Sequence, residues 1–404
     1  MTQRPGVRGG SAGEGRTPDD PTSARSGALS RLVVLDCSDT VAGQFCARLF
    51  ADFGASVTLL EPSAGSPIRR LPPFDRRDAG SLLFFHLNTG KRSVILDRTT
   101  AQGAVQFAER LAGADVVILP PAEDGAPLRE INPRLVTASV TPFGTSGPLA
   151  GWQATEMILQ ALSGMMHNNG DPGREPLYGC GERASYAAGL AAYIGTLAAL
   201  YARGRGASGQ DVTIDSSQTG ASMGFPYVMQ HIYNGAIRSR GEQIAPVGQV
   251  RCRDGWVCIW IYNHRFAAAV RALGLDQLVE DPRFSAPASR QAHWPALIAL
   301  IQECVADRAA DDLVAGMQAA DVIAARASRP TDLVRDPHLA ARRFWESVET
   351  PDGPRPILGP PYRLSRTPRR ITGPAPALGA DDAGAGEAEA AGPRERGRSR
   401  AGAA

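Results

Sequence analysis

Short apolar runs typical of β-strands alternate with helical patterns through the first third of the chain. The run RLVVLDC at residues 31–37 is followed by a stretch in which Val41, Phe45 and Leu49 recur at every fourth position, and Gly54 supplies a C-terminal stop. Further strand-like runs follow, with the sequences SVTLLE, RSVILD, DVVILP and RLVTASV. Strands that alternate with helices build right-handed βαβ units around a parallel sheet. The alternation therefore predicts an α/β fold with a Rossmann-like parallel sheet.

The pattern changes in the second half of the chain. Residues 247–263, VGQVRCRDGWVCIWIYN, hold two short alternating runs around Asp254 and Gly255, which is a hairpin signal. Helical patterns follow, and a chain of 404 residues exceeds what one hydrophobic core usually serves. We therefore expect a large Rossmann-like domain over residues 29–224 and a smaller α+β domain over residues 225–345.

The two ends of the chain have a different composition. Residues 1–28 are rich in Gly, Ser, Pro and Arg, and residues 372–404 are rich in Ala, Gly and mixed charge. Such segments bury too little apolar surface to offset the entropy lost on ordering. Both ends are therefore predicted to be disordered tails.

Charge and cysteine usage narrow the functional classes. The formal net charge is +2, from 43 basic and 41 acidic residues, so neither a nucleic acid nor a membrane surface is expected as partner. The six cysteines show no C-x-x-C spacing and the six histidines are dispersed, so no metal site is predicted. There is no apolar leader and no uninterrupted run of 18 apolar residues, which favours a cytoplasmic protein acting on a small molecule.

The first strand-to-helix turn argues against a dinucleotide. Its sequence, CSDTVAGQ, lacks the G-x-G-x-x-G pattern that lets the backbone approach a pyrophosphate, so NAD is not expected. Glu61 at the end of the second strand occupies the place of a ribose-binding acid. Without the glycines, an ordinary charge at a strand end is the favoured interpretation.

The segment HLNTGKRSVILD contains Lys91, the only lysine of the chain. Lys91 could lie in a surface turn of an arginine-rich protein, and composition alone favours this interpretation. Alternatively, Gly90 allows close backbone approach while Lys91 and Arg92 supply two cations to phosphate groups.

The stretch GERASYAAGLAAYIGTLAALYARG, residues 181–204, predicts a helix that begins at Ser185. A serine before an apolar helix is a good N-cap. A helix N-terminus also stabilises an anion, but a hydroxyl gains little nucleophilicity there without a base. The nearest acid in the sequence is Glu182.

Nine collinear segments carry a resemblance to a known family. The sequence resembles the family III coenzyme A transferases of the CaiB/BaiF type, which include formyl-CoA transferase, carnitine CoA-transferase and α-methylacyl-CoA racemases. The segments are VLDCSDTVAGQFCARLFADFGASVTLLEP, LNTGKRSVILD, INPRLVTASVTPFGTSGP, ILQALSGMM, AAGLAAYIGTLAALYARGRGASGQDVTIDSS, RCRDGWVCIW, EDPRFSAPASR, RDPHLAARRFW and GPPYRLSRTP.

The resemblance implies an architecture and a ligand. Residues 346–371 would return to the large domain, two chains would interlock like rings in a homodimer, and a CoA ester would be the substrate. The positions that match the family's CoA contacts are Val41, Ala42, Asn88, Lys91, Arg92 and Thr141.

Two segments depart from the family's pattern near these contacts. ILPPAED, residues 118–124, stands where relatives carry an Asn-aromatic pair, which predicts a reshaped pocket wall. Gln44 replaces the usual proline after Ala-Gly, which is a smaller change.

The resemblance also implies a chemistry, and the catalytic position is unusual. In transferring members an aspartate attacks the CoA thioester and forms a mixed anhydride and then an enzyme-bound thioester. The matching residue is Ser185, so Glu182 and Glu156 are the candidate replacements. The acid and base of a racemase would fall at Ser185 and Thr155, so α-proton transfer lacks both partners.

Three functions remain open from the sequence. The first is CoA transfer between carboxylic acids with chemistry altered at Ser185. The second is a non-catalytic CoA-binding subunit that pairs with a second family member. The third is a divergent enzyme of specialised metabolism that acts on a thioester.

Overall fold

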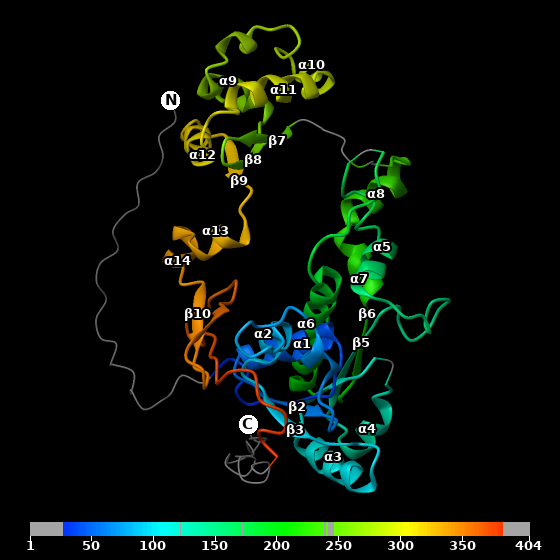
Figure 1. The fold of residues 1–404 in the computed structure, drawn as a ribbon. Coiled ribbons are helices and arrows are strands. Elements are labelled where there is room, and N and C mark those ends of the chain that lie inside the picture. The colour runs from blue at the N-terminus through cyan, green and yellow to red at the C-terminus, as the bar shows by residue number, and fades with distance from the viewer. Residues whose placement is uncertain (1–26, 122, 172, 238–239, 241–245, 383–404) are drawn as a thin grey trace, which may run out of the picture. The chain divides into compact units, whose positions relative to one another are not determined.

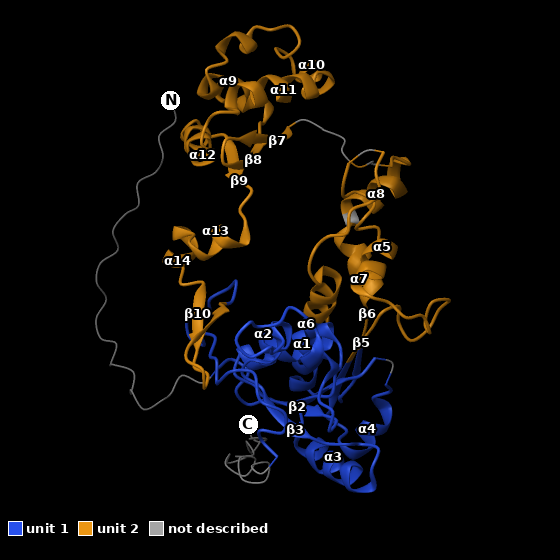
Figure 2. Ribbon diagram, viewed as in Figure 1, with its two compact units in different colours: residues 1–138, 193–212, 360–404 blue, residues 139–192, 213–359 orange. Residues whose placement is uncertain are grey.

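The computed structural model describes residues 27–121, 123–171, 173–237, 240 and 246–382 (Figure 1). The chain divides into two compact units (Figure 2). Unit 1 comprises residues 1–138, 193–212 and 360–404, and unit 2 comprises residues 139–192 and 213–359. The predicted domain boundary at residue 224 differs from this division. The chain passes from unit 1 to unit 2 after residue 138, returns to unit 1 after residue 192 and enters unit 2 again after residue 212.

A six-stranded sheet forms the centre of the α/β part, which confirms the predicted fold class. Its strand order is β3-β2-β1-β4-β5-β6, and β1 pairs in parallel with β2 and β4 while β2 pairs in parallel with β3. This is the doubly wound order, with a topological switch point between β1 and β4. The strands are β1 (Val33–Asp36), β2 (Ser56–Glu61), β3 (Arg92–Ile95), β4 (Val116–Leu119), β5 (Val136–Thr141) and β6 (Asp211–Asp215).

The helices of unit 1 begin and end where the sequence provides caps. The Thr40 side chain accepts a hydrogen bond from the Gly43 N–H and starts α1 (Val41–Asp52), and Gly54 with φ +92° follows its end. Phe107 and Leu111 of α3 (Ala101–Gly113) pack in one cluster with strand residues. The other helices of this part are η1 (Pro67–Arg70), α2 (Leu82–Asn88), α3 (Ala101–Gly113) and α4 (Ala126–Ile131).

The helix α6 (Arg183–Gly204) begins in unit 2 and continues in unit 1. It is the one helix of the described residues that is long and apolar enough to cross a membrane, by length and composition. A buried core helix passes the same test, and 39% of its most apolar window is buried. Length and composition alone therefore do not make α6 a membrane span.

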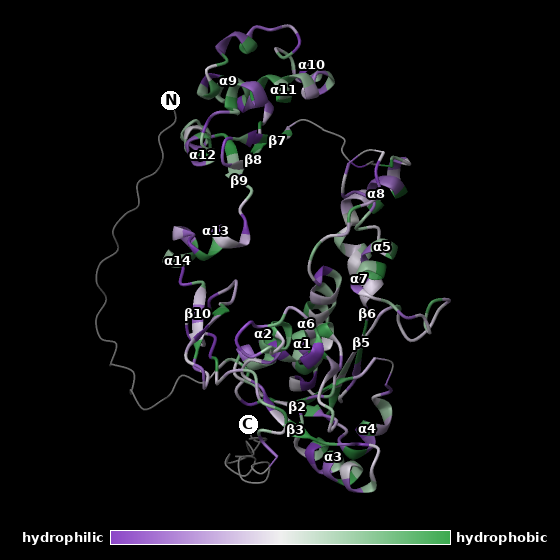
Figure 3. Cartoon of the chain, viewed as in Figure 1, coloured by the Kyte–Doolittle hydropathy of each residue, from purple (hydrophilic) through white to green (hydrophobic). Residues whose placement is uncertain are grey.

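Unit 2 contains the predicted hairpin and its own core. β7 (Val247–Cys252) and β8 (Gly255–Trp260) pair antiparallel around Asp254, and β9 (Ile323–Arg326) extends the sheet. Trp294 and Phe284 are among the large side chains buried beside this sheet. Helices of the unit carry both hydrophobic and hydrophilic residues in Figure 3, as expected for helices with one buried face.

The remaining elements of unit 2 follow in chain order. They are α5 (Glu156–Leu162), α7 (Ser216–Met223), α8 (Phe225–Asn234), η2 (Asn263–Arg265), α9 (Phe266–Leu273), η3 (Asp276–Val279), α10 (Pro287–Ala292), α11 (Trp294–Val305), α12 (Ala310–Ala319), α13 (Pro330–Val334), α14 (Pro337–Ala341), β10 (Trp345–Val348) and β11 (Arg355–Leu358).

The C-terminal segment after residue 359 belongs to unit 1, and its residues 381 and 382 are hydrogen-bonded to the edge strand β3. The Asp381 carboxylate accepts from the Ser93 N–H at 2.9 Å, and the Asp382 carboxylate accepts from the Ile95 N–H at 2.7 Å. The prediction of a disordered tail from residue 372 is therefore wrong for residues 372–382, because these side chains pair with the sheet edge. The rest of that tail and residues 1–26 lie outside the described residues.

Candidate functional site

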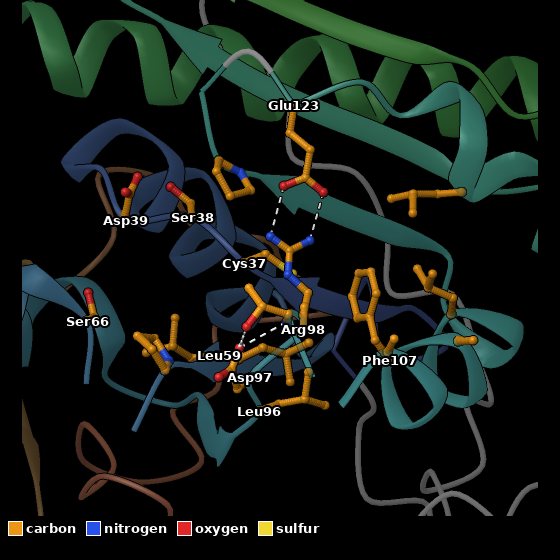
Figure 4. Close-up of a pocket in the computed structure, with 18 of the residues that line it drawn as sticks. Cys37, Ser38, Asp39, Leu59, Ser66, Leu96, Asp97, Arg98, Phe107 and Glu123 are labelled. Atoms are coloured by element: carbon orange, nitrogen blue, oxygen red, sulfur yellow. Dashed lines mark hydrogen bonds and ion pairs between the residues drawn. The ribbon is translucent and has the colours of Figure 1, made fainter. Parts of the chain in front are cut away.

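Unit 1 contains a cavity of about 590 Å³ at the carboxyl ends of its strands (Figure 4). Its lining includes residues of the loops that follow four strands: Cys37, Ser38 and Asp39 after β1, Pro62 and Ser66 after β2, Leu96, Asp97, Arg98 and Thr99 after β3, and Pro120 and Glu123 after β4. In open α/β sheets, ligands bind outside the carboxyl ends of the strands at the switch point. The cavity occupies that place.

The cavity combines apolar walls with charged groups. Phe107 and Leu111 of α3 contribute to the apolar wall. The Arg98 guanidinium donates two hydrogen bonds to the Glu123 carboxylate, at 2.7 and 2.8 Å, and lies 4.9 Å from the centre of the Phe107 ring. Because it bonds to Glu123, the pKa of Arg98 is raised. Hydrogen bonds from Thr99 hold the pKa of Asp97 below its usual range, so Asp97 is ionised at neutral pH.

Lys91 lies inside unit 1, in a closed network of hydrogen bonds. Its Nζ donates to Asp36 Oδ2 at 2.8 Å, to the Gln44 carbonyl at 2.8 Å and to Asn88 Oδ1 at 2.9 Å. The Lys91 and Asp36 side chains are both fully buried. Burial raises the pKa of Asp36 and lowers the pKa of Lys91, while the ion pair opposes both shifts. All three hydrogens of the ammonium are in use.

Gln44 connects this network to the cavity. Its Nε2 donates to the Ser38 carbonyl at 3.1 Å and to Ser66 Oγ at 2.8 Å, and its Oε1 accepts from Asn88 Nδ2 at 2.8 Å. Ser38 and Ser66 both line the cavity. A proline, the residue that the resemblance implies at position 44, could make none of these side-chain bonds, so the change to Gln44 adds three hydrogen bonds and is larger than expected.

A second cluster lies in unit 2, where Glu156 caps helix α6. Glu156 Oε1 accepts from the Ala184 N–H at 2.7 Å and from Gln160 Nε2 at 2.8 Å, and Oε2 accepts from the Ser185 N–H at 3.0 Å and Ser185 Oγ at 2.7 Å. The helix begins at Arg183, so Ser185 is its third residue and not its N-cap. The expected capping role of Ser185 is wrong, because the carboxylate of Glu156 occupies the helix N-terminus and the Ser185 hydroxyl donates to it.

Glu182 stands just before α6 and differs from Glu156. Its carbonyl accepts the first helical hydrogen bond, from the Tyr186 N–H at 2.8 Å. Within the described part of the chain its half-buried carboxyl has no hydrogen bond or ion pair. Burial, together with the nearby Glu156, raises the pKa of Glu182. At the start of α6, Glu156 is therefore fixed by four donors, whereas Glu182 keeps unoccupied acceptors among the described residues.

The comparison with known proteins assigns the family. The model of CoA-transferase family III matches residues 29–382. The chain belongs to this family. Within the described residues, no group of three or more His, Cys, Asp or Glu could hold a metal ion.

Relatives of this family III chain match it over most of their length. It is 27% identical to a succinate–glutarate CoA-transferase of Agrobacterium fabrum, over 88% of the chain and 94% of the relative. It is 28% identical to a subunit of the succinyl-CoA:(R)-benzylsuccinate CoA-transferase of Thauera aromatica, over 87% and 92%. The crystal structure of a CaiB/BaiF family protein from Brucella suis matches with a TM-score of 0.80 and 27% identity, covering 89% of this chain and 98% of that one.

The six residues that the resemblance to family III predicts as CoA contacts lie at several places in the fold. Val41 and Ala42 form the first turn of α1, and Arg92 donates to Ser56 Oγ at 2.6 Å. Thr141 Oγ1 accepts from the Gly144 N–H at 2.8 Å. These residues, like Asn88 and Lys91, are absent from the cavity lining. A phosphate contact by Lys91 would require one of its three hydrogen bonds to break.

Sequence reasoning missed Arg98 and Glu123, which pair across the cavity. Arg98 directly follows the predicted strand RSVILD, and Glu123 lies in the loop after the predicted strand DVVILP, so their position at the carboxyl edge was available as a signal. Glu61, weighed as a ribose-binding acid, instead accepts from Arg69, from Ser93 Oγ at 2.6 Å and from the Ser66 N–H at 2.8 Å. These bonds explain its buried position at the end of β2 and leave it outside the cavity lining.

Proposed function

We propose that the protein transfers CoA between carboxylic acids and that Glu182 supplies the attacking carboxylate. The observation that carries this proposal is the Glu182 carboxyl, which has unoccupied acceptors within the described part of the chain and precedes α6, close to Ser185, the residue that matches the catalytic aspartate by resemblance. The two relatives are named as CoA-transferases that act on pairs of acids, which supports the reaction class.

The carboxylate chemistry requires an ionised and accessible group. In the proposed step, a Glu182 oxygen attacks the acyl carbon of the thioester, the C–S bond breaks, and CoA leaves as the thiolate from a mixed anhydride. The thiolate then attacks the Glu182 carbonyl, which releases the first acid and forms an enzyme thioester. The second acid attacks the carbonyl of this thioester, which expels CoA as the thiolate and forms a second mixed anhydride with Glu182. The thiolate then attacks the acyl carbon of the second acid, so that the new acyl-CoA forms and the Glu182 carboxylate leaves.

Ser185 and Glu156 fit supporting roles in this scheme. The Ser185 hydroxyl donates to a Glu156 carboxylate that also accepts from Gln160 and from two N–H groups of α6, so four hydrogen bonds occupy its oxygens. The same four bonds lower the nucleophilicity of Glu156. We assign both residues to holding the start of α6, next to Glu182.

The cavity of unit 1 is the proposed site for the nucleotide part of CoA. Its place at the switch point and its apolar walls support a purine base, and the Ser38 and Ser66 hydroxyls offer hydrogen bonds. The residues proposed for this role are Ser38, Asp39, Asp97, Arg98 and Phe107, which all line the cavity, whereas the six positions that the resemblance supplies do not.

The test is CoA exchange between acyl-CoAs and free acids, followed by mass spectrometry, in the wild type and two variants. Glu182→Gln should lower exchange by about a thousandfold or more, because an amide cannot form the anhydride. Ser185→Ala is the matched control and should keep most activity. The enzyme thioester, trapped by hydroxylamine, should map to the peptide that contains residue 182. Full activity of Glu182→Gln would refute the assignment.

A second candidate function has support from Ser185 and from one relative. Ser185, which matches the catalytic aspartate by resemblance, has no carboxylate. The Thauera aromatica relative is named as a subunit. A non-catalytic subunit would bind CoA without exchange and gain activity only with a second family member. Wild-type protein that binds CoA, shows no exchange alone and gains none from Ser185→Asp would favour this function.

We also propose assembly into a homodimer in the cytoplasm. On α8, Ile232 is 64% and Tyr233 is 80% exposed, and a second copy would cover such apolar side chains. The cysteines are all free, which fits a reducing compartment. Sedimentation should give the mass of two chains at all concentrations, whereas a monomer would contradict the assembly.

A further inference from the structure

Arg98 and Glu123 form an ion pair that joins two walls of the unit 1 cavity. Arg98 follows β3 and Glu123 follows β4, and Figure 4 shows the guanidinium directed at the carboxylate. The two side chains remain 27% and 31% exposed, so solvent and ligand can reach both. We call this pair the clasp.

The charges of the cavity do not suit a phosphorylated ligand while the clasp is closed. Among the described residues, its lining contains three carboxylates, Asp39, Asp97 and Glu123, and one cation, Arg98. Because Glu123 neutralises Arg98, these described lining residues offer no free positive charge. CoA carries a 3′-phosphate and a diphosphate, and phosphates bind preferentially to unpaired cations.

We propose that Glu123 competes with a ligand phosphate for Arg98, so that the clasp sets the discrimination between CoA and dephospho-CoA. The inference rests on the proposed function in that the cavity must accept the nucleotide of CoA. A guanidinium fork binds phosphate and carboxylate with the same two-donor geometry, so one can replace the other.

Two side chains next to Arg98, those of Phe107 and Asp97, bear on the exchange of Glu123 for a phosphate. Phe107 lies under the Arg98 guanidinium at 4.9 Å, which keeps the side chain in the cavity when Glu123 releases it. Asp97 accepts from the Thr99 N–H at 2.9 Å and from Thr99 Oγ1 at 2.6 Å. Asp97 is held in this turn, so Glu123 is the carboxylate that occupies the two Arg98 donors.

The experiment measures binding of CoA and dephospho-CoA to the full chain by calorimetry at one ionic strength. Glu123→Gln should increase the preference for CoA over dephospho-CoA by about tenfold, because two charge-assisted donors become free. Arg98→Gln should bring the two affinities close to each other. Asp281→Asn is the matched control, because Asp281 makes a similar two-donor pair with Arg283 in unit 2 and should leave the preference unchanged.

Each outcome bears on one of the two proposals. If neither nucleotide binds to wild type or to any variant, the proposed function fails and this inference fails with it. If CoA binds wild type and Glu123→Gln leaves the preference unchanged, the inference alone is overturned. Glu123→Ala removes the same acceptors and should move the preference in the same direction, which separates the loss of charge from an effect of the new amide.

Discussion

The buried pair of Lys91 and Asp36 explains why a chain with 43 basic residues keeps one lysine. Three acceptors surround Nζ at 2.8–2.9 Å, which matches the three hydrogens of an ammonium. A guanidinium is larger and planar and presents its donors in a fork. Composition alone favoured a surface turn, and only the contacts of Asp36 and Gln44 show the reason for lysine.

Loss of this ammonium should destabilise unit 1. Lys91→Met leaves the Asp36 carboxylate buried without its partner. We therefore expect the free energy of unfolding to fall by about 3–5 kcal/mol. Faster hydrogen exchange in peptides of β1 and α1 would report it. The double variant Asp36→Asn with Lys91→Met removes both charges and should recover part of the loss. Equal exchange in the single variant and wild type would contradict a stabilising pair.

The raised pKa of Glu182 predicts a pH dependence of exchange. Only the ionised carboxylate attacks, so kcat should fall as pH decreases through the raised pKa and stay high above it. Ser185→Asp adds a negative charge nearby and should shift this fall to higher pH. A kcat that stays constant down to the pH of unfolding would exclude Glu182 as the attacking group.

At the scale of elements, the edge strand β3 depends on the C-terminal segment. Asp381 and Asp382 satisfy two backbone N–H groups that would otherwise face solvent or another chain. The double variant Asp381→Ala with Asp382→Ala should raise hydrogen exchange in β3 and lower stability by about 1–3 kcal/mol. Asp276→Ala, at an exposed carboxylate of unit 2, is the control and should leave β3 exchange unchanged.

Sequence reasoning predicted the strands and the hairpin because apolar periodicity is local. It failed where partners are distant in the chain. The Glu156 carboxylate reaches Ser185 across 29 positions, and the Asp381 carboxylate reaches Ser93 across 288. No periodicity encodes such pairs, so the start of α6 and the end of the ordered chain were both misplaced.

At the scale of the molecule, one stretch of unit 2 is continuous in sequence and carries its own core. The buried cluster from Val250 to Ala324 includes Trp294 and the sheet β7-β8-β9. A fragment of residues 246–328 should therefore fold alone and unfold cooperatively by circular dichroism. A fragment of residues 27–138 should not, because unit 1 also requires residues 193–212 and 360–382. A non-cooperative melt of the first fragment would contradict this.

The burial of Lys91 also affects how the protein tolerates the compounds it is proposed to bind. Thioesters and acid anhydrides acylate exposed amines without any enzyme, and lysine side chains are the usual targets. The only lysine here has a fully buried side chain whose ammonium is held by three acceptors, and the other basic side chains are arginines and histidines. The folded protein therefore presents no lysine amine to its own reactive substrates, and chemical self-modification at lysine requires unit 1 to open first.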